Sequence, residues 1–502
     1  MKAFLSYALL AAAVLSVCGC GRDSSRRSAG AGEPDTVAGY WADSTVRKGL
    51  YVSSDSAQTA SIYLNGAKYY ATGTNCYELW LVSLHKERDA QGRIDLSDSF
   101  AALDVLRRNG VGVVRFNCGV YFASELTAYT QNREEYLSAL ARLAAYAEKL
   151  EIGLIPSFFW IYTTVPDYVG EPYRSWGIEG SRTTEFLKAY TTDVVEALRP
   201  YKSIFAWEFG NEFNLQADLP NWQKEFGKTD ARYWIQGSDV RYAIRLFAET
   251  VRSLDPDGRM IVSGHSVMRP SQYHLNTEYT FSVDDTQQYR AATELFTPGP
   301  AEGMSEHVYE AGREFADRGK VTLSEQIAVA MGTARSLNKV YIVGEFGGLL
   351  PLKQAYRTYY DAFLDGGVQL SLIWNFSPGR RTEYSFSADD ETGKYIFYLI
   401  REYNAMLKES TAAVGSASCR HEVPAQRGHR FPFLIAGDGP VSVIRGSERV
   451  AVCRRNAHME GVFPLRRCYR LFSAGSMPSV ESLRSLIHVC ECSGEPRCES
   501  PG

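Results

Sequence analysis

The chain has 502 residues, which is too long for one small domain and fits one large α/β barrel with extensions. Hydrophobic residues make up 45% and charged residues 22%, ordinary values for a globular protein, and a formal net charge of -4 gives no basis for nucleic-acid binding. Aromatic residues make up 13%; we expect most of them in the core, and exposed rings would suit the apolar faces of sugars.

The first 20 residues, MKAFLSYALLAAAVLSVCGC, predict a secretory signal, because Lys2 precedes an apolar run and then small residues. The segment resembles a bacterial lipoprotein signal, which implies Cys20 as the lipidated mature N-terminus. Cys18 fits less well, because Val17 precedes it. The alternative is a cleaved signal without lipid. We therefore expect an exported bacterial lipoprotein, anchored to a membrane on the periplasmic side or at the cell surface.

One short segment separates the signal from the main domain, and a hairpin lies near the start of that domain. Residues 21–45 are rich in Ser, Gly and Arg without periodicity, which is typical of a flexible tether. The run from Ile62 to Tyr70 then alternates on either side of Asn65-Gly66, the strongest two-residue hairpin signal. We expect this N-terminal β-hairpin to plug the floor of a barrel.

Residues 46–410 alternate strand-like apolar runs with amphipathic stretches, the pattern of a parallel sheet covered by helices. Eight such units predict a (β/α)8 TIM barrel of the α/β class. The expected strands are Tyr70–Asn75, Val111–Asn117, Ile152–Phe159, Ile204–Glu208, Met260–Gly264, Met304–Tyr309, Val340–Glu345 and Gln369–Trp374. The expected helices include Ser99–Asn109, Glu134–Leu150, Thr184–Leu198, Val240–Leu254 and Leu323–Leu337.

The composition changes after Lys408, where lysine and tryptophan disappear and arginine becomes dense. Six of the ten cysteines lie in residues 411–502: Cys419, Cys453, Cys468, Cys490, Cys492 and Cys498. One interpretation is a small separate domain stapled by disulfides. The other, which we favour, is a poorly ordered tail that does not fold, as a shifted reading frame would produce.

Two glutamates end apolar strands. Glu212 follows Asn211 in IFAWEFGNEFN, after the fourth expected strand, and Glu345 lies in VYIVGEFGG, at the end of the seventh. A buried strand that ends in a carboxylate needs a reason, because an unpaired buried charge is costly. Taken alone, Asn211-Glu212 also fits a solvated turn, and Glu345 fits a structural ion pair. Together they predict opposed carboxylates at the barrel mouth, as glycoside hydrolysis requires.

Further residues stand at strand ends in the same order: Arg115 in VVRFN, His307 and Tyr309 in SEHVY, and Trp374 in LIWNF. With the two glutamates they give a resemblance to glycoside hydrolase family 5, the cellulase and β-mannanase clan of retaining (β/α)8 enzymes, over roughly residues 60–410. The resemblance implies Glu212 as acid/base and Glu345 as nucleophile. Individually, an ion pair would explain Arg115, and core packing would explain the other three.

The resemblance assigns a role to each substrate-binding residue. Arg115 would keep the nucleophile ionised, as a neighbouring cation does, and Tyr309 would donate to the same carboxylate. Asn211 would bond the sugar 2-hydroxyl, whose hydrogen bond strengthens in the transition state. Trp374 would form the floor under the sugar ring, and His307 would bond a hydroxyl or a neighbouring side chain.

The chain departs from the family pattern at the third strand, IPSFFW, where many members carry a histidine. Trp160 is therefore a candidate for a sugar subsite, and His265 in SGHS is a candidate for the rim of the cleft, or else an ordinary loop histidine. The wording WEFGNEF also differs from the WELANEP-like wording of many mannanases. These departures leave the sugar undetermined.

The remaining motifs point away from other chemistry. Cys76 and Cys118 follow neighbouring strands, so they are either a disulfide or two buried thiols. The eight histidines are scattered without a zinc pattern, and no phosphate-binding glycine loop is present in the sequence. We expect no metal, no cofactor and no nucleic-acid partner, and we expect a monomer.

The sequence thus predicts a retaining glycoside hydrolase that cleaves a β-linked mannan or glucan, as polysaccharide or oligosaccharide, by double displacement. The rivals are a non-catalytic surface glycan-binding lipoprotein and a transglycosylase. Endo and exo action remain open alternatives.

Overall fold

The computed structural model describes residues 36–54, 59–219, 230–347, 353–378, 382, 384–418, 441–445, 449–454 and 460–464. The predicted signal with Cys20 and the first part of the predicted tether lie outside the described residues. The same is true of most of residues 411–502.

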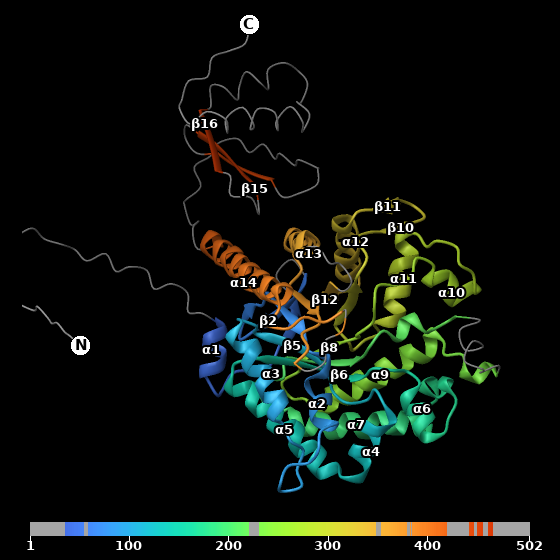
Figure 1. The fold of residues 1–502 in the computed structure, drawn as a ribbon. Helices are drawn as coiled ribbons and strands as arrows, with labels where there is room; N and C mark the ends of the chain where they lie inside the picture. Colours follow the sequence, from blue (N-terminus) through green and yellow to red (C-terminus); the bar gives the residue numbers. More distant parts are fainter. Residues whose placement is uncertain are drawn as a thin grey trace, which may run out of the picture.

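Eight parallel strands close into a barrel in the order β12-β13-β4-β5-β6-β7-β8-β9, and helices surround it (Figure 1). The strands are β4 (Ala71–Asn75), β5 (Val113–Asn117), β6 (Gly153–Phe159), β7 (Ala206–Gly210), β8 (Met260–Val262), β9 (Gly303–Val308), β12 (Val340–Gly347) and β13 (Leu370–Trp374). Each begins and ends within two residues of its predicted bounds. The prediction of a (β/α)8 barrel is confirmed.

The outer layer consists of helices between the strands. The longer ones are α3 (Ser97–Arg108), α4 (Ala123–Gln131), α5 (Arg133–Lys149), α7 (Arg182–Leu198), α9 (Gly237–Leu254), α11 (Thr286–Phe296), α12 (Leu323–Ser336), α13 (Lys353–Gly366) and α14 (Glu391–Ser418). Shorter ones are α2 (Leu81–Leu84), α6 (Thr164–Val169) and α10 (Gln272–Glu278), with 3-10 turns η1 (Tyr77–Leu79), η2 (Tyr173–Gly177), η3 (Phe213–Leu215) and η4 (Ala231–Tyr233).

Burial explains why the strands read as apolar runs. Every residue of β6 and of β12 is buried, because one face of each strand points into the barrel and the other packs under helices. One apolar cluster fills the space between strands and helices. A second cluster fills the lower barrel interior, with residues such as Val113, Ile155 and Ile342.

The N-terminal strands close the floor of the barrel, as predicted. They are β1 (Tyr51–Ser54), β2 (Ala60–Leu64) and β3 (Ala67–Lys68), which form a three-stranded antiparallel sheet rather than a single hairpin. Asn65 and Gly66 turn β2 into β3 with positive φ angles of 49° and 83°, the geometry of a two-residue hairpin turn. Ile62 and Leu64 belong to the apolar cluster inside the barrel.

The predicted tether is too long at its C-terminal end. Residues Thr36–Ala42 form helix α1, and Tyr40 is fully buried. Its hydroxyl donates to the Lys202 carbonyl at 2.5 Å, and its ring packs against Phe205 at 5.9 Å. Composition predicted a flexible segment, but the aromatic residue drives this stretch onto the N-terminal end of the barrel.

The C-terminal part also contains regular structure. Helix α14 continues past residue 410 to Ser418, and β14 (Val441–Arg445), β15 (Arg449–Arg454) and β16 (Glu460–Pro464) form an antiparallel sheet. The cysteines of this region lie outside the residues whose side chains the structure describes, so disulfides here stay a prediction. Of the described helices, none is long and apolar enough to cross a membrane.

Candidate active site

The residues predicted to carry the chemistry gather at the C-terminal ends of the barrel strands. Catalytic groups of barrel enzymes lie at this end. Hydrogen bonds and the close approach of His307 to Glu345 connect six residues in one continuous network: Arg115, Asn211, Glu212, His307, Tyr309 and Glu345.

Glu345 lies at the centre of this network, and its side chain is 5% exposed. Arg115 Nη1 donates to Glu345 Oε1 at 2.6 Å, and the Tyr309 hydroxyl donates to Oε2 at 2.5 Å. His307 Nδ1 lies 3.5 Å from Oε1. Burial and then the charge of Glu345 raise the pKa of Tyr309, so the phenol stays protonated as a donor.

Glu212 is the more accessible carboxylate, with 28% of its side chain exposed. Its Oε1 lies 2.8 Å from His307 Nδ1, and its backbone N–H donates to the Gly264 carbonyl at 2.9 Å. The backbone is left-handed, with φ 54° and ψ 28°. A non-glycine residue in this region costs about 1–3 kcal/mol, and such strain is typical of functional sites.

The two carboxylates are close together. One oxygen of Glu212, one oxygen of Glu345 and a ring nitrogen of His307 all lie within 4.8 Å of one another. Retaining glycosidases place their carboxyl groups about 5–5.5 Å apart, whereas inverting enzymes leave room for a water between them. The spacing therefore suits a nucleophile and an acid/base rather than two groups that share a water.

The protonation states of the two carboxyls are coupled. Burial raises the pKa of Glu345, although the charges of His307 and Arg115 oppose this, and the charge of Glu212 raises it further. Burial acts in the same direction on Glu212, but the hydrogen bond and charge of His307 outweigh it, so the pKa of Glu212 lies below its ordinary value. At this distance the two groups titrate as a pair.

A bulge in β12 places Glu345. The pairing of β12 with β9 shifts register between Val343 and Glu345. Bulges re-aim a side chain and are frequent beside active sites. Gly344 permits this geometry, because a Cβ there would lie 2.5 Å from Ser305 Oγ.

Arg115 connects the two sides of the site. The side chain is fully buried, and besides Glu345 it donates to Glu208 Oε1 at 2.6 Å, to Asn75 Oδ1 at 3.0 Å and to Asn211 Oδ1 at 2.9 Å. Glu208 and Asn75 are not among the predicted site residues. A signal was available for Glu208, which lies within the same WEFGNE segment as Glu212 and ends the predicted fourth strand.

We expect Arg115→Met to lower the free energy of unfolding by about 3–5 kcal/mol, because it leaves Glu208 and Glu345 buried without their cation. Chemical denaturation of both proteins measures the difference. Arg93→Met removes the same charge from an arginine that is 52% exposed, and should cost at most about 1 kcal/mol. Equal losses in the two variants would show that Arg115 is not a buried ionic centre.

Aromatic rings line one side of the network. The Arg115 guanidinium carbon lies 4.8 Å from the ring centre of Trp160, whose Nε1 donates to the Ser157 carbonyl at 3.2 Å. The rings of Trp160 and Trp374 are 6.1 Å apart. Tyr77, which the sequence analysis missed, lies 4.8 Å from Trp160 and 6.1 Å from Trp374. The structure thus brings Trp160 beside Arg115, and Trp374 beside Trp160.

His265 does not lie at the rim of a cleft. It is buried, its Nε2 lies 2.8 Å from Thr297 Oγ1, and its Nδ1 lies 3.0 Å from the Ser266 carbonyl. Burial lowers its pKa to about 3, so the ring stays neutral. Both ring nitrogens therefore already have partners within the protein, and the assignment of His265 to substrate binding stays a prediction.

Cys76 and Cys118 are two buried free thiols rather than a disulfide. Burial raises the pKa of both, which makes them poor nucleophiles.

The donor set of the site does not favour a metal. Glu212, His307 and Glu345 are close enough to surround a cation. However, Glu345 already accepts hydrogen bonds from Arg115 and Tyr309, and a metal would have to compete with the buried guanidinium. The geometry is that of a carboxylate held by an ion pair and a hydrogen bond.

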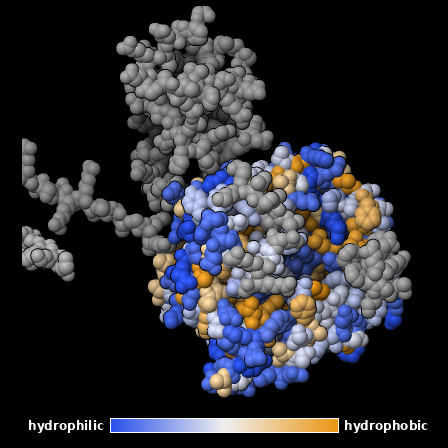
Figure 2. All heavy atoms as spheres, viewed as in Figure 1, coloured by the Kyte–Doolittle hydropathy of each residue, from blue (hydrophilic) through white to orange (hydrophobic). Residues whose placement is uncertain are grey.

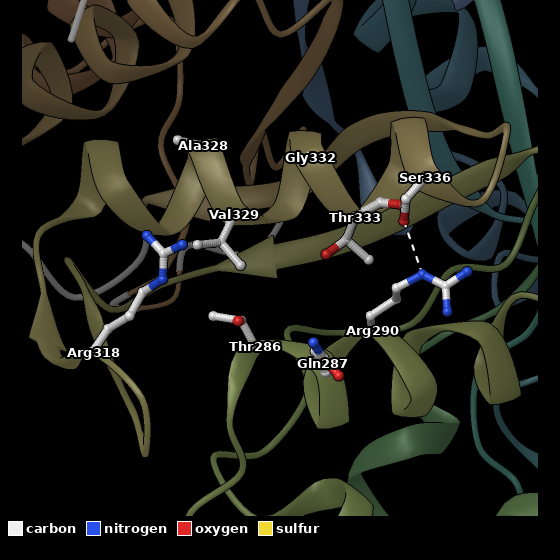
Figure 3. Close-up of a pocket in the computed structure, with 9 residues that line it drawn as sticks. All are labelled: Thr286, Gln287, Arg290, Arg318, Ala328, Val329, Gly332, Thr333 and Ser336. Carbon is white, nitrogen blue, oxygen red and sulfur yellow. Dashed lines mark hydrogen bonds between the residues drawn. The ribbon is translucent and has the colours of Figure 1, made fainter. Parts of the chain in front are cut away.

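The structure also contains a groove away from the predicted site. Figure 3 shows a groove of about 320 Å³ between α11 and α12, where Arg290 donates to Ser336 Oγ at 2.9 Å. No residue of the predicted site lines it. On the face shown in Figure 2, hydrophobic residues form separate patches among hydrophilic ones.

A family model described as Cellulase (glycosyl hydrolase family 5) matches residues 98–377, more than half of the chain. This range contains all the predicted catalytic and substrate-binding residues. No curated protein matches the chain.

Three of the solved structures that are similar to this chain are named as mannanases or as a mannosidase. The endo-1,4-β-mannanase from Rhizomucor miehei is 14% identical, with a TM-score of 0.51, over 71% of this chain and 99% of that one. The endo-1,4-β-D-mannanase from Thermotoga petrophila is 15% identical, with a TM-score of 0.47, over 67% and 100%. The exo-β-1,4-mannosidase from Opitutaceae bacterium strain TAV5 is 18% identical, with a TM-score of 0.45, over 70% and 62%.

Proposed function

Because the chain belongs to glycosyl hydrolase family 5 and is thus a glycoside hydrolase acting on O-glycosyl bonds, we propose that it cleaves a β-linked mannan or glucan with retention of configuration. The observation that carries the proposal is the pair Glu212 and Glu345, with carboxylate oxygens within 4.8 Å. Arg115, His307 and Tyr309 bind this pair.

In the first step, Glu345 attacks the anomeric carbon from the face opposite the leaving group and forms a glycosyl ester. Glu212 donates its proton to the glycosidic oxygen, so the departing sugar leaves as a neutral alcohol. Arg115 and Tyr309 orient the attacking carboxylate and oppose the effect of burial, which raises its pKa. Asn211, whose Oδ1 accepts from Arg115 Nη2, bonds the 2-hydroxyl of the sugar.

In the second step, Glu212 removes a proton from water, and the oxygen of that water displaces Glu345 from the anomeric carbon. Esterification has removed the negative charge of Glu345, and with it a repulsion that disfavours ionised Glu212. The same residue therefore acts first as an acid and then as a base. Two inversions at one carbon give net retention.

The names of similar proteins support the substrate class. The matching family is a cellulase family, and the Rhizomucor miehei structure is named a mannanase. A β-1,4-mannan and a β-1,4-glucan differ only in the orientation of the 2-hydroxyl on each sugar, so both belong on the substrate panel. We also propose that Cys20 carries the lipid anchor, which would place the enzyme on a membrane surface of the bacterium.

Nuclear magnetic resonance of fresh digests tests the proposal. We expect release of soluble sugars from a β-mannan or a β-glucan, with the new reducing end appearing first as the β-anomer. Initial appearance of the α-anomer would contradict double displacement. No release from any member of a panel of mannans, β-glucans, xyloglucan and aryl glycosides would favour the non-catalytic glycan-binding protein. Transfer products at high oligosaccharide concentration would favour a transglycosylase.

A further inference from the structure

A line of aromatic rings leads from the catalytic residues to the protein surface. It starts at Trp374 and Trp160 and continues through Tyr77, whose ring centre lies 5.7 Å from that of Tyr121. The ring of Tyr121 lies 4.4 Å from that of Phe122. We call these five residues the aromatic track. Its segments follow β13, β4, β5 and β6, four adjacent strands of the barrel.

Phe122 ends the track and is exposed, with 51% of its surface open to water. A phenylalanine with half of its surface exposed contributes little to the free energy of folding, because the contribution of burial scales with the apolar area removed from water. Trp160 is buried and the other three rings are half-buried, so Phe122 is the most exposed ring of the track. An exposed flat ring of this kind is suited to the apolar face of a sugar.

Hydrogen bonds hold the backbone under the exposed end of the track. The carboxylate of Glu125 is buried, and its Oε2 accepts the N–H of Tyr121 at 2.8 Å and also that of Phe122. The carbonyl of Tyr121 accepts from Thr164 Oγ1 at 2.7 Å. Because the backbone of this platform is already ordered in the free protein, binding costs less conformational entropy.

The other end of the track is tied to the nucleophile. Tyr77 N–H donates to Asn375 Oδ1 at 2.9 Å, which joins the segment after β4 to the segment after β13. Trp160 stacks on Arg115, the cation of Glu345. Glu212, in contrast, contacts His307 of β9 and Gly264, which follows β8, on the other half of the barrel. A departing sugar protonated by Glu212 would therefore lie over β8 and β9.

We propose that the aromatic track binds the part of the sugar chain that stays attached to Glu345, and that Phe122 and Tyr121 form its distal subsite. This inference rests on the proposed function and deepens it. A glycan that reaches Phe122 extends several rings beyond the attacked sugar, so the enzyme cleaves within chains rather than removing single terminal sugars. Phe122 and Tyr121 thus determine specificity for chain length.

Kinetics with Phe122→Ala and Tyr121→Ala test the track, using the oligosaccharide series from mannobiose to mannohexaose and the matching cello series. With the longest substrates we expect kcat/KM to fall roughly 3- to 10-fold per ring. With an aryl monoglycoside, which does not reach the distal subsite, kcat/KM should not change. Tyr398→Ala, which removes an exposed aromatic residue from α14, is the control and should change neither.

Three results would overturn the inference: an equal loss on the aryl monoglycoside, no loss on any hexaose, or release of only monosaccharide from hexaoses by the unmodified enzyme. Binding of mannohexaose and cellohexaose to Glu345→Ala, measured by calorimetry, separates the track from the chemistry. If the protein hydrolyses no substrate, the proposed function is wrong. The track is then tested by binding alone. Adding Phe122→Ala to Glu345→Ala should weaken binding of the hexaose, and unchanged binding would contradict the track.

Discussion

Glu345→Gln is expected to lower turnover of the best polysaccharide more than about 10⁴-fold, beyond what a positioned proton-transfer group usually contributes. The amide has nearly the shape of the carboxylate but cannot form the glycosyl ester. It also leaves Arg115 with only Glu208 as an acidic partner. Reducing-sugar assays measure the loss, and Glu249→Gln, which changes an exposed glutamate on α9, should retain full activity.

A smaller variant at the same position separates a nucleophile from a merely structural carboxylate. Glu345→Ala leaves space beside Arg115 for a small anion such as azide. Azide would attack the anomeric carbon of an activated β-aryl glycoside directly, in a single inversion, and give the α-glycosyl azide. Ordinary activity in Glu345→Gln, or a β-glycosyl azide from Glu345→Ala, would mean that another residue forms the covalent intermediate.

The barrel could be predicted because its strands are buried on both faces. Runs such as those of β6 and β12 are apolar throughout, and turn or helix signals separate them. The catalytic pair could be predicted for a related reason, since Glu212 and Glu345 interrupt apolar strands at their ends. Helix α1 was missed because one buried aromatic, Tyr40, decides the conformation of a segment with the composition of a linker.

Other parts of the site depend on geometry that residue type does not reveal. Glu208 and Asn75 belong to the site only because Arg115 spans the barrel between them. His265 follows a strand just as Arg115 and His307 occupy strand ends, but its ring bonds Thr297 and lies buried. The bulge that aims Glu345 depends on the room that Gly344 leaves for Ser305. These outcomes depend on the register between strands and on which face a loop residue presents.

Glu212→Ala is expected to lower turnover of polysaccharide about 10²–10⁴-fold, the contribution of a positioned general acid/base. An aryl glycoside with a dinitrophenolate leaving group needs no proton, so its first step should remain fast. The second step then lacks its base, and the glycosyl ester should accumulate as a burst. Azide, which needs no base, should restore turnover and give the β-glycosyl azide, the opposite anomer to that from Glu345→Ala.

The pH dependence provides an independent test of the same residue. The reacting state has one proton on the pair, so kcat/KM falls at low pH, where both carboxyls are protonated, and at high pH, where that one proton is lost. In Glu212→Ala the alkaline fall should disappear with the dinitrophenyl substrate, because no acid remains to lose its proton. The acid fall should remain, since protonation of Glu345 still blocks attack. An alkaline fall that persists in the variant would assign the acid role to another group near His307.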